Sequence, residues 1–184
     1  MAKAKTSPSW SDVKAKLQGF GQDGLVALIH DLYLANKDNR VFLHTRFALD
    51  GEALEPYKRM IERWIFPDIF RNAPHSVAKA KAAISDYKKA TGDPLGLVEL
   101  MVFYCERAAA FSSEVALDDE GYYDALVRMY GRALDGLPGL PGRERVIMLA
   151  RLNEVREVCE DVGYGVCDDM ERFLVNHARV HGIG

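Results

Sequence analysis

Apolar side chains recur at steps of three and four residues along most of the chain, which is the period of an amphipathic helix. The set Leu25, Leu28, Ile29 and Leu32 shows this spacing clearly. No stretch alternates apolar and polar residues with enrichment in β-branched types, so the sequence predicts no sheet. The pattern therefore predicts an all-α fold.

Clusters of glycine and proline divide this helical pattern. The segment from Gly136 to Gly142 is the strongest break, because its three glycines and two prolines cannot continue a helix. Gly92 and Pro94 mark a helix end followed by a helix start. A short turn is expected from Pro67 to Phe70. The segments between the breaks predict about nine helices, near residues 9–18, 22–35, 38–48, 51–65, 76–90, 95–111, 119–135, 142–162 and 165–180.

The length of 184 residues, with 48% hydrophobic and 28% charged types, is typical of one soluble globular domain. We predict a basic flexible tail at residues 1–8 and a single helical domain over residues 9–184. The helix at 95–111 is the most apolar all round and is expected at the centre. Residues 76–111 and 119–162 each form a predicted hairpin, which fits either a compact bundle or HEAT-like stacking.

Charge is distributed unevenly along the chain. The overall net charge is −3, but residues 1–90 carry 15 Lys and Arg against 10 Asp and Glu, whereas residues 91–184 carry 9 against 17. If the halves form separate ends, this asymmetry favours a charged partner or head-to-tail self-association. If they intermingle, the charges mix. Nonspecific binding to nucleic acid is not expected at this net charge.

The cysteines and the terminal segment indicate a cytoplasmic protein. The three cysteines, Cys105, Cys159 and Cys167, are odd in number and have no C-x-x-C spacing, a pattern that fits a reducing compartment. Residues 1–8 are not followed by an apolar core and do not resemble a signal peptide. The longest apolar run is too short to span a membrane, so no membrane association is expected.

Four segments resemble an uncharacterised bacterial family of helical proteins, catalogued as a domain of unknown function. The first is LVALIHDLYLANKDNRVFL from Leu25 to Leu43, which opens with a helix, an Asn-Lys-Asp-Asn turn and a second helix. The others are AAISDYKKA from residue 82, LVELMVFYCE from residue 97 and YYDAL from residue 122. Together they lie within residues 25–135. The resemblance implies a bacterial, mostly helical protein and implies no activity.

Two sets of residues are candidates for binding a partner. Lys37, Arg40 and His44 share one stripe of a predicted helix and would provide charge selectivity for an acidic group. The alternative for the His30–Arg46 segment is a capped turn with a solvated face, shaped by its asparagines. Trp64, Phe66 and Phe70 follow a helix as an aromatic strip, which marks a partner site if it is exposed.

Candidate catalytic and metal-binding residues are few. His177 and His181 have the spacing of two metal ligands on one helix face, but the sequence offers no His-Glu-x-x-His motif beside them. The acidic groups around Asp118, Glu157 and Asp168 suit helix starts and salt-bridged faces. We therefore assign no metal, no cofactor and no catalytic residue.

The sequence predicts a non-enzymatic protein-protein interaction or regulatory module in a bacterial cytoplasm. Its partner would be an unidentified, acidic protein, and a homo-oligomer is an alternative. Two other functions stay open. One is a small metal-dependent hydrolase whose His and acidic residues come from different helices. The other is a nucleic-acid binder that uses the lysine-bearing N-terminal half.

Overall fold

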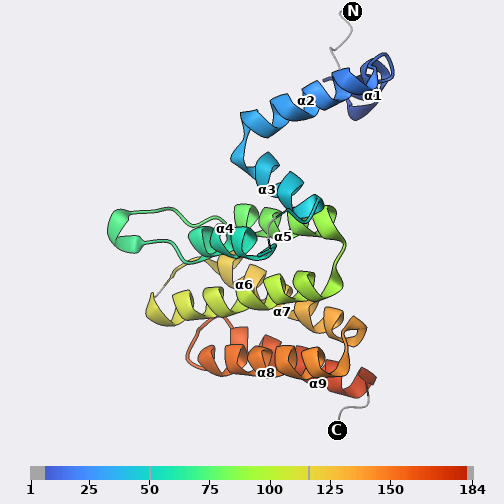
Figure 1. Ribbon diagram of the computed structural model, residues 1–184. Coiled ribbons are helices and arrows are strands. Elements are labelled where there is room, and N and C mark those ends of the chain that lie inside the picture. Colours follow the sequence, from blue (N-terminus) through green and yellow to red (C-terminus); the bar gives the residue numbers. More distant parts are fainter. Residues whose placement is uncertain (1–6, 50, 116, 182–184) are drawn as a thin grey trace, which may run out of the picture. The chain divides into compact units, whose positions relative to one another are not determined.

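The chain is helical throughout the part that the computed structural model describes, residues 7–49, 51–115 and 117–181 (Figure 1). Over these residues there are nine α-helices, two short 3₁₀ helices and no strand, which confirms the all-α prediction. Backbone contacts divide the chain into two compact units, residues 1–44 and 45–184. The predicted tail lies outside the described residues except for Ser7 and Pro8, and the single domain over residues 9–184 stays a prediction.

The first unit contains the helices α1 (Trp10–Leu17) and α2 (Gln22–Ala35) and most of α3 (Lys37–Arg46). Ser9 and Asp12 form a capping box at the start of α1, in which the Ser9 backbone amide and hydroxyl both donate to Asp12 Oδ2, at 2.7 and 2.8 Å. Within this unit no side chain of α1 or α2 is buried, although α2 is apolar on most of its surface. Residues 7–44 therefore have no apolar core of their own.

The second unit consists of three helical hairpins. Its α-helices, with their bounds, are α4 (Glu55–Ile65), α5 (Val77–Thr91), α6 (Pro94–Glu114), α7 (Glu120–Gly136), α8 (Gly142–Val158) and α9 (Val166–His181). The 3₁₀ helices η1 (Ile69–Arg71) and η2 (Leu137–Gly139) lie in the α4–α5 and α7–α8 connections. Two of the predicted bounds are wrong by four residues, for local reasons, and α6 ends three residues later than predicted. Helix α4 begins four residues later than predicted, with Pro56 in its first turn. After Val158 the chain makes tight turns in which the Val162 amide bonds to the Cys159 carbonyl.

The hairpins stack in chain order. Helix α6 packs against both α4 and α8, and α7 packs against α9. The first helices of the hairpins, α4, α6 and α8, therefore form one layer, and the second helices, α5, α7 and α9, form the other (Figure 1). The predicted hairpins at residues 76–111 and 119–162 are wrong in their pairing, because α5 packs mainly against α4 and α6 mainly against α7. HEAT-like stacking stays a prediction. Residues on all sides of α6 are buried, including the consecutive positions Leu100, Met101 and Val102. The prediction that this helix is central is confirmed.

Two buried tyrosines of this core provide a matched test of hydrogen bonding. The Tyr122 hydroxyl donates to the Ile65 carbonyl at 2.7 Å, whereas the Tyr104 hydroxyl has no hydrogen-bond partner among the described residues. We expect Tyr122→Phe to lower the free energy of unfolding by about 1–2 kcal/mol, because the buried carbonyl loses its donor. Tyr104→Phe should leave stability unchanged or raise it. Urea unfolding measures both, and equal losses would contradict the assignment.

Candidate functional site

The charged stripe predicted on α3 is present, and its members have different surroundings. Lys37 and Arg40 are exposed, whereas His44 is half-buried and its Nε2 lies 3.0 Å from the Tyr33 hydroxyl of α2. This hydrogen bond ties α3 to α2 within the first unit. Asn39 also holds this junction, because its side-chain amide donates to the Leu32 carbonyl at 2.7 Å. The segment thus has the features of a capped turn, and its role in ligand or partner binding stays a prediction.

The aromatic strip lies in the second unit, where its three members are held in different ways. Trp64 is half-buried, and the Lys79 ammonium lies 3.8 Å from its ring centroid. Phe66 is also half-buried, since its ring meets Phe111 edge-on at 5.5 Å and Arg107 lies over its face at 4.5 Å. Phe70, by contrast, is 93% exposed. Of the three rings in the strip, only that of Phe70 is almost entirely exposed to solvent.

Phe70 is carried by a closed turn, formed by η1, between α4 and α5. The Asp68 carboxylate accepts from the Phe70 amide at 3.0 Å, and the Asp68 carbonyl accepts from the amides of Arg71 and Ala73, at 3.2 and 3.1 Å. Asn72 closes the turn in a left-handed conformation, with φ of 51°. Figure 1 shows the loop projecting beyond the ends of both helices. A fixed backbone therefore displays the phenyl ring in water.

A cavity lies beside this turn. Its volume is about 370 Å³, and its apolar walls come from two parts of the chain. We call it the aromatic groove, and its principal walls are Phe66, Pro67 and Phe70 from the loop and Phe111, Glu114 and Val115 from the end of α6. The wall that α6 contributes was not predicted from the sequence. The signal was weak, since Phe111 follows Phe66 by 45 positions and only the fold joins them.

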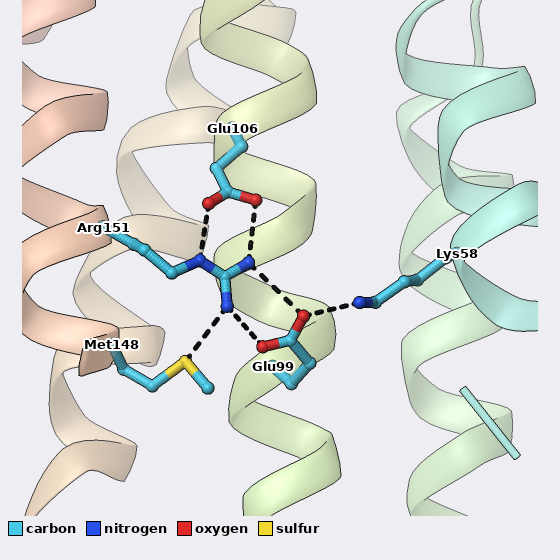
Figure 2. Close-up of polar contacts among 5 residues, drawn as sticks. All are labelled: Lys58, Glu99, Glu106, Met148 and Arg151. Atoms are coloured by element: carbon cyan, nitrogen blue, oxygen red, sulfur yellow. Dashed lines mark hydrogen bonds and ion pairs between the residues drawn. The ribbon is translucent and has the colours of Figure 1, made fainter. Parts of the chain in front are cut away.

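A second polar feature connects three helices of this unit (Figure 2). Arg151 of α8 holds Glu106 of α6 through two hydrogen bonds, at 2.7 and 2.9 Å, and also contacts Glu99 through both terminal nitrogens. Lys58 of α4 reaches the same Glu99 carboxylate at 2.6 Å. Burial raises the pKa of Glu99, but the hydrogen bonds and charges of Arg151 and Lys58 outweigh it, so the pKa lies below 4.5.

We call Lys58, Glu99, Glu106 and Arg151 the ionic cluster. Its two cations and two carboxylates balance, and each carboxylate already has a cationic partner. The cluster therefore serves packing between the hairpins and offers no poised acid or base. It also pairs Lys58, from the basic half of the sequence, with Glu99 from the other half, so the charges of the two halves mix here.

The remaining candidate chemical groups are mostly buried. Burial is the largest cause that raises the pKa of both Cys105 and Cys159, the latter to about 12, so both thiols stay protonated. His177 is buried against His181, with ring centroids 4.7 Å apart. Burial lowers the pKa of His177, which favours its neutral form. Among the described residues, no group of three or more His, Cys, Asp or Glu side chains is placed to hold a metal ion.

Two further findings concern the chain as a whole. In the described part, no helix combines the length and the apolar character that crossing a membrane requires. Comparisons with protein-family models, with curated proteins and with solved structures find no match. The resemblance of residues 25–135 to a bacterial helical family therefore stays a prediction.

Proposed function

We propose that this protein is a non-enzymatic interaction module of a bacterial cytoplasm and that it docks a protein partner through the aromatic groove and Phe70. The exposure of Phe70 on a hydrogen-bonded turn carries the proposal. Burying a phenylalanine side chain contributes about 1.5–3 kcal/mol, which a partner would gain on covering this ring. Exposed aromatic residues beside well-formed pockets dominate many protein interfaces.

The turn also reduces the cost of binding. Its hydrogen bonds fix the backbone before a partner arrives, so little conformational entropy is lost on docking. The groove beside it already has rigid walls, because Phe66 is held by Phe111 and Arg107. An apolar side chain of the partner would enter the groove while Phe70 packs against the partner's surface.

Photocrosslinking tests this function. A benzoylphenylalanine is placed at Ile69, which lines the groove, and the protein is irradiated in cells of its native host. We expect a covalent protein adduct whose yield falls severalfold when Phe70→Ser is added, because the ring no longer anchors the partner. The same probe at Val146, an exposed apolar position on α8, measures the background. An Ile69 yield that equals this background, or that does not depend on Phe70, would contradict the proposal.

The basic side chains of α3 form a separate part of the proposal. Lys37 and Arg40 are exposed and would attract acidic residues of the partner, with His44 on the same stripe. A second benzoylphenylalanine at Val26, which is exposed on α2 of the same unit, reports on this surface, and a lower yield is expected with Lys37→Glu and Arg40→Glu together. Lys14→Glu with Lys16→Glu makes the same charge change on α1 and should have little effect. The hydrolase and nucleic-acid alternatives stay untested predictions.

A further inference from the structure

We infer that the aromatic groove binds Phe70 of a second copy of this chain, which produces a symmetric dimer. This inference rests on the proposed function of the same surface and names its partner. It follows from two properties of that surface. The exposed Phe70 ring, a knob, lies beside the aromatic groove, a hole that could receive it. Arg71 follows Phe70, and Glu114 at the rim of the groove carries the opposite charge.

The knob and the hole permit a two-fold contact. Phe70 forms one wall of the groove, and Phe66, Phe111 and Val115 form the others. Two copies can meet face to face, related by a two-fold axis. When this axis lies midway between Phe70 and the groove, it places each Phe70 over the groove of the other copy. Both contacts then form at once, and the two Phe70 rings meet near the axis. Such an interface closes after two copies and leaves no free knob.

At the aromatic groove, the charges favour a second copy over an acidic segment of another protein. Arg71 follows Phe70, and its side chain is 86% exposed and forms a solvent-exposed ion pair with Asp68, with Nε 3.3 Å from Oδ2. Glu114 lies exposed at the rim of the groove. The exchange of Phe70 brings Arg71 of each copy toward Glu114 of the other, so the dimer contains this attraction twice. An acidic segment would instead meet the carboxylate of Glu114 at the rim of the groove.

The size of the surface sets the expected affinity. A single turn and one groove cover less area than a standard stable interface, so the dissociation constant should be about 10–300 µM. The full chain should therefore pass from monomer to dimer with rising concentration. Sedimentation velocity across this range measures the transition directly.

Variants of Phe70 and of the charged residues test the geometry. Phe70→Ser should weaken the dimer by about tenfold or more without changing the thermal midpoint, because the side chain is exposed in the monomer. Val146→Ser removes an exposed apolar side chain from α8 and should leave the dimer intact. Arg71→Glu alone and Glu114→Arg alone should each weaken self-association, since each places like charges together in both halves of the interface.

A mixture of these two charge variants provides the sharpest test. In a dimer between Arg71→Glu and Glu114→Arg, both facing pairs carry opposite charges, so the mixture should dimerise when neither variant does alone. A wild type that stays monomeric, or a dimer that ignores Phe70→Ser and this mixing, would overturn the inference.

The crosslinking experiment separates failure of this inference from failure of the proposed function. An Ile69 adduct with a second copy supports both. A Phe70-dependent adduct with a different protein keeps the proposed function and overturns the second copy as the occupant. No adduct above the Val146 background would overturn both.

Discussion

Replacing Arg151 by alanine is expected to lower the free energy of unfolding by about 2–4 kcal/mol. The variant leaves Glu99 and Glu106, whose side chains are 14% and 31% exposed. Lys58, which contacts Glu99, is then the one cation of the cluster. Two carboxylates of like charge on one face of α6 then repel each other away from bulk water. The Arg151 side chain itself is only 24% exposed, so its packing is lost as well.

Arg156 provides the matched control for this prediction. It also lies on α8, and its side chain is 22% exposed, but its acidic partners Glu157, Glu160 and Glu171 are themselves exposed. Arg156→Ala should therefore cost under about 1 kcal/mol, because solvent screens the carboxylates that remain. Urea unfolding at neutral pH compares the two variants. Equal losses would contradict a packing role for the ionic cluster.

The same cluster gives the wild type a defined acid sensitivity. The pKa of Glu99 is lower in the folded chain than its ordinary value of 4.5, so the unfolded state binds a proton first as the pH falls. The stabilisation is complete above about pH 4.5 and is lost as the pH falls toward the folded pKa. We expect the free energy of unfolding of Arg151→Ala to fall less than that of the wild type as the pH is lowered below about 4.5.

Gly96→Ala is expected to lower the free energy of unfolding by about 2 kcal/mol, although alanine favours a helix by about 1 kcal/mol. A Cβ at this position would lie 2.0 Å from the Tyr87 hydroxyl and 2.7 Å from Asp93 Oδ2. Tyr87 cannot swing away easily. Its ring is buried and packs edge-on against Tyr57 at 5.3 Å, and its hydroxyl donates to Asp93. The added methyl must therefore displace the α5–α6 junction.

Gly142→Ala serves as its control. Gly142 begins α8, and nothing lies within 4 Å of the position that its Cβ would occupy. This variant should be neutral or slightly stabilising, because alanine restricts the unfolded chain. Thermal unfolding compares the two substitutions. A Gly96→Ala protein as stable as the wild type would show that Tyr87 and Asp93 can reorganise freely.

Most of the helices could be predicted from the sequence, because the residues that form, cap and end a helix lie close together along the chain. Breaks such as Gly92-Asp93-Pro94 were visible, and the structure shows Asp93 capping α6 through the amides of Leu95 and Gly96. The bounds near Glu55 and Val158 were wrong, since apolar periodicity continues into the tight turns beyond these ends. Propensity alone does not separate such turns from the helix.

The candidate site was predictable only in part. The strip of Trp64, Phe66 and Phe70 was visible as an aromatic cluster, but which ring faces solvent depends on the closed turn at Asp68. The groove's α6 wall comes from a contact between distant segments. Glu99 and Glu106 lie seven positions apart on a largely apolar helix, and this spacing places them on one face. Arg151 reaches that face only because the hairpins stack, which the sequence does not show.

The stacking order of the hairpins also bears on how the chain folds during synthesis. Because α6 meets α4 and α8, and α7 meets α9, the major contacts join segments that are close together along the polypeptide. Closing such short loops costs little entropy, so folding should be rapid. Each hairpin that leaves the ribosome would find the preceding one already formed, and its apolar side would be covered within seconds of translation.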